Sequence, residues 1–208
     1  MSHPLRRKLS TCVLPLALAA AIGVPAHRAV AQDVLDAKSA LHFRNEYAAD
    51  LDTVHVKIMA LANAIPADKY SWRPAAEVRS ISEALMHVAA EWFYYVPGSV
   101  GGKPPADFGV PRETMPTLEK ITTKAEVLAQ LNKSWAHSKA VLAAADASTL
   151  TGKYKPWGLT LDQSAFSMSG DLHEPLGQHI TFARSAGAKP HRAKEPRRTH
   201  PREHRTAR

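Results

Sequence analysis

Residues 69–95 (KYSWRPAAEVRSISEALMHVAAEWFYY) constrain the fold most, because they predict a loop that turns sharply into an amphipathic helix. Pro74 disfavours a helical conformation at Arg73, so the chain stays extended there. Ser80 and Glu83 have the spacing of a capping box, in which each side chain bonds a free backbone N–H at a helix start. The apolar residues of the helix that follows recur at helical spacing, and they are Ile81, Leu85, Val88, Trp92 and Val96.

Three further segments carry apolar residues at helical spacing, at roughly residues 40–64, 123–146 and 160–187. Thr123 and Thr160 each begin a further capping box. Four amphipathic helices of this length predict an all-α domain in which each helix buries one face against the others.

The connection between the second and third helices is long for a helical protein. Pro97 and Gly98 are expected to end helix two, and residues 99–122 are rich in Gly and Pro with little periodicity. A link of this length can return along the bundle, so that helices two and three run parallel. We therefore expect a four-helix bundle with up-down-down-up topology and a long crossover between helices two and three.

The N-terminal residues 1–31 have the three parts of a signal peptide. Residues 6–8 are basic, residues 9–24 are apolar but short for a membrane span, and residues 29–31 form a small-x-small cleavage site. We expect cleavage before Gln32 and export to the periplasm or the medium. An uncleaved anchor is the alternative.

Charge is distributed unevenly along the chain, whose net value is +8. Residues 1–31 carry four basic and no acidic side chains, and residues 188–208 carry eight basic and two acidic ones, which leaves −2 for residues 32–187. We therefore expect a folded body at 32–187 without a nucleic-acid partner, and a disordered basic tail at 188–208. The single cysteine, Cys12, lies in the predicted signal peptide, so a mature chain would have no disulfide or thiolate site.

Histidines are the residues on which a functional reading depends. Helical spacing places His87 beside Glu83 and Glu91, away from the centre of the apolar stripe. His87 is then either part of a polar strip or a metal ligand with Glu91 as its partner or as a general base. His55 lies at the edge of the first apolar stripe and is expected to be structural, and His137 is expected to be solvated.

The fourth helix holds a second set of polar residues. Asp171 and Pro175 share a face that His179 continues, whereas His173 points well away from them. Asp171 and His173 are therefore not expected to chelate one ion from a regular helix. Pro175 removes a backbone hydrogen bond and clashes with the carbonyl of Asp171, so the helix is either kinked or altered there.

Four motifs in this order resemble the DinB-like (damage-inducible, YfiT-type) family. They are W-R-P-x-x-x-V-R-S-I-S-E, L-M-H-V-A, H-E-x-L-G-Q and F-A-R-x-x-G, and the likeness covers roughly residues 41–187. The resemblance implies a four-helix bundle and a divalent metal, often zinc or nickel, held by one histidine on helix two and two histidines four residues apart on the last helix. It also implies, for some members, metal-dependent thiol transfer or isomerisation.

The resemblance carries over only in part. His87 matches the ligand on helix two, whereas the pair on the last helix falls at Asp171 and Pro175. Aspartate can still ligate through oxygen, but proline cannot ligate through its side chain. His173 matches a histidine common in similar exported members. The expected metal ligands are thus His87, Asp171 and His173, with Glu91 as the candidate base. A shifted site that uses His173 or His179 is the alternative.

Three hypotheses follow for function. The first is an exported bundle with a zinc or nickel site, working as a metal-dependent thiol transferase or hydrolase. The second is a non-catalytic bundle that has lost the metal because of Pro175, and the third is a binding module that uses the basic tail. Whether the chain is an enzyme stays open. We expect a small-molecule partner and no stable membrane span after signal cleavage, and a homodimer stays open.

Overall fold

The computed structural model describes residues 35–151 and 156–188, and these residues form helices with no strand among them. The long helices are α1 (Ala37–Ala64), α2 (Ile81–Phe93), α5 (Lys124–Ala144) and α7 (Leu161–Ser185). The short ones are η1 (Ala67–Lys69), α3 (Tyr95–Ser99), α4 (Pro111–Leu118), α6 (Ala147–Leu150) and η2 (Pro156–Gly158). The predicted signal peptide at 1–31 and the predicted tail beyond Ala188 lie outside the described residues.

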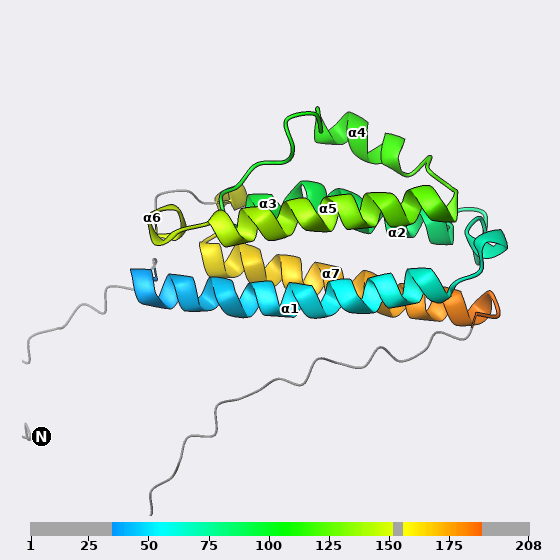
Figure 1. Ribbon diagram of the computed structural model, residues 1–208, viewed down its shortest axis with the longest axis horizontal. Coiled ribbons are helices and arrows are strands. Elements are labelled where there is room, and N and C mark those ends of the chain that lie inside the picture. Colours follow the sequence, from blue (N-terminus) through cyan, green and yellow to red (C-terminus); the bar gives the residue numbers. More distant parts are fainter. Residues whose placement is uncertain (1–34, 152–155, 189–208) are drawn as a thin grey trace, which may run out of the picture. The chain divides into compact units, whose positions relative to one another are not determined.

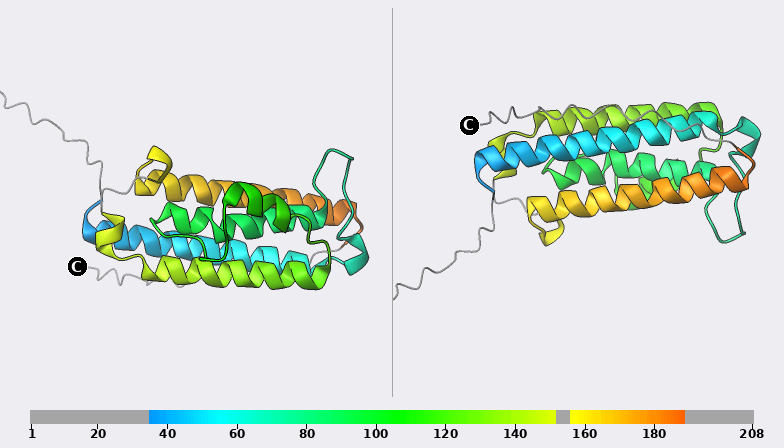
Figure 2. Two further views of the ribbon diagram at one scale, coloured as in Figure 1. Left: turned by 90° about the horizontal axis from the view of Figure 1, so that it is seen from above. Right: turned by 90° about the horizontal axis from the view of Figure 1, so that it is seen from below.

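The long helices lie side by side, with α1 packed against α5 and α7, and α2 packed against α5 and α7. In Figure 1, α1 and α7 run from left to right, whereas α2 and α5 run from right to left. Figure 2 shows the same four helices from above and below. The prediction of an all-α fold is confirmed. None of the helices in the described residues has the length and hydropathy that a membrane span requires.

Helix starts follow the capping signals in the sequence. The Ser80 hydroxyl accepts from the Glu83 N–H at 3.3 Å, and the Glu83 carboxylate accepts from the Ser80 N–H at 2.7 Å. Thr160 forms the same reciprocal box at the start of α7. At the start of α5 only half of the box is present, because the Glu126 carboxylate accepts from the hydroxyl of Thr123 instead of its N–H. These caps fix where α2, α5 and α7 begin.

The core is built from the apolar faces of the four long helices. The stripe predicted for helix two is fully buried, and Trp92 on α2 is its largest side chain. Trp92 meets Trp135 on α5 edge to face, with ring centroids 5.6 Å apart. His55 on α1 stacks on Trp135 at 4.8 Å. Aromatic packing of this kind ties α1, α2 and α5 together.

The predicted end of helix two was wrong, and the crossover contains a helix that was not predicted. Pro97 and Gly98 do not end helix two, because α2 ends at Phe93 and both residues lie inside the short helix α3. Pro97 lies in the first turn of α3. Backbone N–H groups in a first turn have no acceptor within their helix, so the N–H that proline lacks costs no helical hydrogen bond there. The crossover at 99–122 is also partly helical, since it contains α4, which packs against α2. This contact brings the end of the crossover next to the polar face of α2.

The end of the folded body also differs by one residue from the prediction. Gly187 follows α7 with a φ of +83°, as a helix-ending glycine does. Ala188, which was assigned to the tail, is buried, and its N–H bonds to the carbonyl of Ala183 at 2.8 Å. Such a contact just after the glycine completes the helix end, so Ala188 belongs to the folded body.

Candidate functional site

His87 lies on α2 between two carboxylates. Its Nδ1 is 3.1 Å from Oε1 of Glu119, at the end of α4, and its Nε2 is 3.4 Å from Oε1 of Glu91, one turn further along α2. The same Glu119 oxygen accepts from Nε of Arg79 at 3.1 Å. The His87 side chain is 30% exposed, so it is partly accessible to solvent.

Glu91 is the most unusual titratable group of α2. It is 3% exposed, and its Oε2 is buried without a hydrogen bond of acceptable geometry. Burial raises the pKa of Glu91 to about 8, and the Asp171 carboxyl on α7 raises it further, whereas Arg79 lowers it. A carboxyl with this pKa is largely protonated at neutral pH, and the protonated form carries an O–H donor.

The two candidate ligands on α7 face different neighbours. Asp171 lies close enough to Glu91 to shift its pKa. His173 instead places its Nε2 at 3.1 Å and 3.2 Å from the two carboxylate oxygens of Asp50 on α1. The Ser169 hydroxyl donates to the same carboxylate at 2.5 Å. The structure thus brings His87, Glu91 and Asp171 together and leaves His173 on the α1 side of α7, as its spacing from Asp171 predicted.

His179 lies one turn beyond Pro175 on α7 and is 1% exposed. Its Nδ1 is 2.5 Å from the Pro175 carbonyl. A carbonyl can only accept, so Nδ1 carries the hydrogen of the ring. Burial lowers the pKa of His179 to about 4, although hydrogen bonding to Pro175 and the nearby Ala84 carbonyl oppose this shift. The neutral ring therefore presents a lone pair at Nε2, which is buried and makes no hydrogen bond of acceptable geometry.

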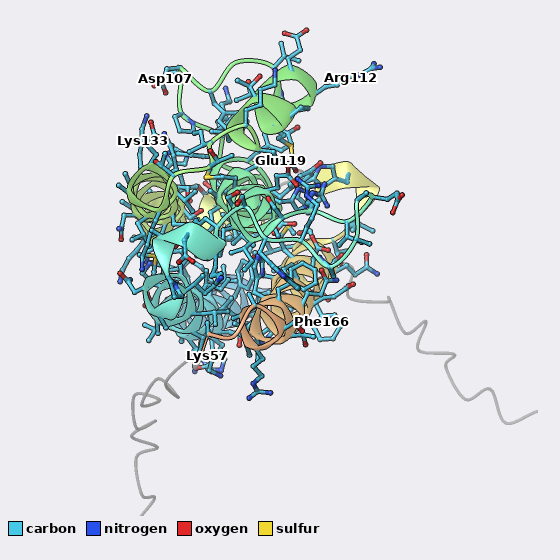
Figure 3. All side chains as sticks on the ribbon, turned by 90° about the vertical axis from the view of Figure 1, so that its right-hand side faces the viewer. Lys57, Asp107, Arg112, Glu119, Lys133 and Phe166 are labelled. Atoms are coloured by element: carbon cyan, nitrogen blue, oxygen red, sulfur yellow. The ribbon has the colours of Figure 1, made fainter. Side chains whose placement is uncertain are left out.

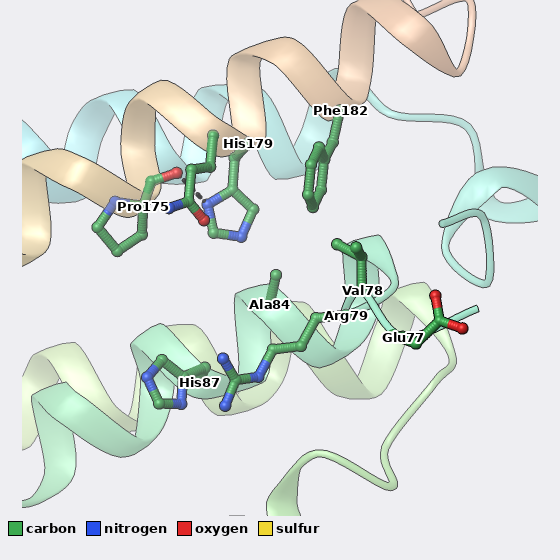
Figure 4. Close-up of a pocket in the computed structure, with 9 residues that line it drawn as sticks. Glu77, Val78, Arg79, Ala84, His87, Pro175, His179 and Phe182 are labelled. Carbon is green, nitrogen blue, oxygen red and sulfur yellow. Dashed lines mark hydrogen bonds between the residues drawn. The ribbon is translucent and has the colours of Figure 1, made fainter. Parts of the chain in front are cut away.

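A pocket of about 550 Å³ opens between α2 and α7 beside these groups. Figure 4 shows His179 and Phe182 reaching down from α7 and His87 and Arg79 lying on the α2 side. Pro175 and Ala84 also line it. Arg79 and Glu119 were not predicted as site residues, and His179 was considered only as a ligand of an alternative, shifted metal site. The signal for His179 was its place on the face of Asp171 and Pro175, whereas nothing in the sequence indicated that Glu119 meets α2.

His55 and His137, the two further histidines considered in the sequence analysis, have local roles. His55 is partly buried between Trp92 and Trp135, and burial lowers its pKa to about 4, which agrees with its assignment as structural. His137 was expected to be solvated, but it is partly buried and its Nε2 lies 3.0 Å from the Lys103 carbonyl in the crossover. Neither histidine contributes to the pocket between α2 and α7.

The donor set does not fit a three-histidine metal site. Pro175 occupies one of the two positions on the last helix and has no side-chain donor, and His173 is turned toward Asp50. Within residues 35–151 and 156–188, no group of three or more His, Cys, Asp or Glu side chains is placed to hold a metal ion. His87 and Asp171 remain the two groups at the family's positions that could donate to a cation.

The helical bundle and this site place the chain in a class of helical proteins that carry a polar site between two packed helices. The DinB superfamily model matches residues 50–165, and the chain belongs to that superfamily. The match ends before Asp171, so it covers the α2 side of the site and not the α7 side. No curated protein and no solved structure matches the chain.

Proposed function

We propose that this protein is an exported DinB-superfamily bundle that has lost the three-histidine metal site and binds a small molecule in the pocket between α2 and α7. In this proposal the bundle has the up-down-down-up topology, with α4 as part of the crossover. The opposite directions of α1 and α7 against α2 and α5 in Figure 1 support that topology. The observation that carries the loss of the metal is Pro175, because a position that requires a donor holds a residue without one.

Pocket chemistry supports the binding role. The site keeps the volume typical of small-molecule pockets, and its lining mixes apolar side chains with a few polar groups. His87 is held by Glu119 and faces Glu91, so its orientation is fixed without a metal. The position of His87 beside the pocket is therefore fixed although the metal site lacks its third ligand residue.

Export is part of the proposal and is supported by the sequence. The basic residues 6–8, the apolar stretch 9–24 and the small-x-small motif at 29–31 have the order of a cleavable signal peptide. Determining the N-terminal residue of the secreted protein tests it. We expect Gln32 as the first residue, and an intact N-terminus on a membrane-bound protein would contradict cleavage.

Calorimetric titration with zinc and nickel tests the loss of the metal site. We expect no stoichiometric binding to the wild-type protein and a gain of affinity in Pro175→His, because the new imidazole would stand four residues after Asp171 and opposite His87. Pro175→Ala is the matched control, since it removes the proline without adding a donor. Tight binding to the wild type that is abolished by His87→Ala would contradict the proposal.

One observation favours a second candidate, the metal-dependent thiol transferase or hydrolase. The buried Glu91 and the neighbouring Asp171 place two carboxyls beside His87, and a cation would favour the ionised form of both. In that case Glu91 would be the general base, and His87 and Asp171 would be ligands. The same titrations separate the two candidates, because this one requires binding that depends on His87 and Asp171 in the wild-type protein.

A further inference from the structure

Glu119 places a carboxylate against two side chains that line the pocket. Its Oε1 accepts from Nε of Arg79 at 3.1 Å and lies 3.1 Å from Nδ1 of His87. Arg79 and His87 both line the pocket between α2 and α7, whereas Glu119 does not. Figure 4 shows the guanidinium of Arg79 beside the His87 ring on the α2 side of the pocket. These two side chains therefore form a site for an anion, and Glu119 occupies it from outside the pocket.

The helix that carries Glu119 into this site is loosely packed. Glu119 follows the last residue of α4, and no residue of α4 is buried. Figure 3 shows Glu119 between α4 and α2, whereas Arg112 extends outward from α4. Before α4, Phe108 is buried against Phe93, and Gly109 follows it with a φ of +73°, a conformation that glycine adopts without strain. A helix with so few buried contacts opens more easily than the core beside it, so α4 has the packing of a lid.

A ligand carboxylate can compete with Glu119 for the anion site. Of the three guanidinium nitrogens of Arg79, only Nε donates to Glu119. A free carboxylate can accept two parallel hydrogen bonds from a guanidinium, which is the stronger arrangement. The Arg79 side chain is 49% exposed, so such a ligand can reach it. The pocket offers apolar surface from Val78 and Phe182 to the remainder of the ligand.

We propose that Glu119 is a displaceable latch: a small apolar carboxylic acid binds Arg79 and His87 from the pocket, displaces Glu119 and releases α4. This inference rests on the proposed small-molecule binding function, and it names the class of ligand and the element that responds to it. Because the ligand and Glu119 exclude each other from one site, ligand binding and closure of α4 oppose each other reciprocally. Neither contact requires a metal.

Hydrogen exchange measured by mass spectrometry tests the latch on residues 32–208, freed of metal with a chelator. Glu119→Gln removes the charge of the latch and should speed exchange of the α4 amides roughly tenfold, the usual effect of weakening a hydrogen bond to a charged group. Glu113→Gln, at an exposed position of the same helix, is the matched control and should leave the exchange unchanged. Equal exchange of α4 in Glu119→Gln and the wild type would overturn the latch.

Two probes of nearly equal shape test the competition in the wild-type protein alone. Hexanoate carries a carboxylate, and hexanamide lacks the charge. At millimolar concentration we expect hexanoate to speed exchange of the α4 amides and hexanamide to leave it unchanged. Hexanoate that leaves the exchange of α4 unchanged, or that raises it no more than hexanamide does, would overturn the inference. This comparison needs no variant to fold.

Isothermal titration calorimetry then assigns the ligand to its site. In Glu119→Gln the uncharged amide holds Arg79 only weakly, so this variant should bind hexanoate roughly tenfold more tightly than the wild type. Arg79→Gln should remove the preference for hexanoate over hexanamide. Equal affinities of the wild type and Glu119→Gln for hexanoate would overturn the competition, and a preference that persists in folded Arg79→Gln would overturn the assignment to Arg79.

The metal titrations report separately on the proposed function. A wild-type protein that binds zinc through His87 and Asp171, and whose α4 is still released by hexanoate once the metal is removed, would contradict the loss of the metal and leave the latch standing. A protein without a metal site whose α4 does not respond to Glu119→Gln would contradict the latch alone.

Discussion

Replacing Glu91 by glutamine should stabilise the protein, and the gain should grow as the pH rises. Glutamine has nearly the shape of a protonated glutamate and never ionises. Burial raises the pKa of Glu91 from an ordinary 4.5 to about 8, so the folded protein holds this proton more tightly than the unfolded chain does. The stability that this group contributes is fully present below its pKa in the unfolded chain. It is lost as the pH rises through its pKa in the folded protein.

The magnitude follows from the size of the pKa shift. Each pKa unit corresponds to about 1.4 kcal/mol, and pH 7 lies about 2.5 units above the pKa of Glu91 in the unfolded chain. Wild-type protein should therefore lose on the order of 2 to 3 kcal/mol of stability between about pH 5 and pH 7 through Glu91. Glu91→Gln should not show this loss.

Urea denaturation followed by circular dichroism, at a series of pH values, measures the difference between the two proteins. His55 and His179 also titrate between the folded and unfolded states, because burial lowers the pKa of each to about 4. Their contribution is lost as the pH falls below about 6.5, in both proteins alike, so it cancels in the difference. Glu113→Gln on the exposed side of α4 is the control. A stability difference that does not change with pH would contradict a raised pKa of Glu91 in the folded protein.

Two further predictions concern the scaffold. Ser80→Ala removes the hydroxyl that caps α2 and should lower the free energy of unfolding by about 1 kcal/mol, measured by urea denaturation; an unchanged value would mean that the cap adds nothing. Gly102→Ala should lower the melting temperature, because a Cβ there would overlap the Val141 side chain and lie 3.1 Å from the Pro97 carbonyl. Gly170 lies within α7, where an added Cβ would meet no atom within 4 Å, so Gly170→Ala should instead stabilise the protein by about 0.5 to 1 kcal/mol. Equal effects of the two glycine substitutions would contradict the packing.

The helices were predictable because their signals are local. Ser80 and Thr160 cap α2 and α7 as their boxes predict, and apolar spacing identified the buried faces of the four long helices. α4 was missed because the crossover is rich in Gly and Pro and lacks a stripe of apolar residues. Its own core contacts are few, and no residue of α4 is buried.

The site was predictable only within one helix. Spacing placed His87 beside Glu91 and separated Asp171 from His173, and the structure shows both relations. It could not show that Glu91 is buried, because the elements that cover α2 come from distant parts of the chain. Glu119 reaches His87 only because the crossover returns along α2, and such a path is set by tertiary packing.

Elemental analysis of purified residues 32–208 shows whether the site holds a metal. We expect zinc and nickel well below one equivalent in the wild type, and close to one equivalent in Pro175→His after incubation with either metal. A wild-type protein that carries nearly one equivalent of metal, and loses it in His87→Ala while remaining folded, would contradict the loss of the metal and establish a metal site in spite of Pro175.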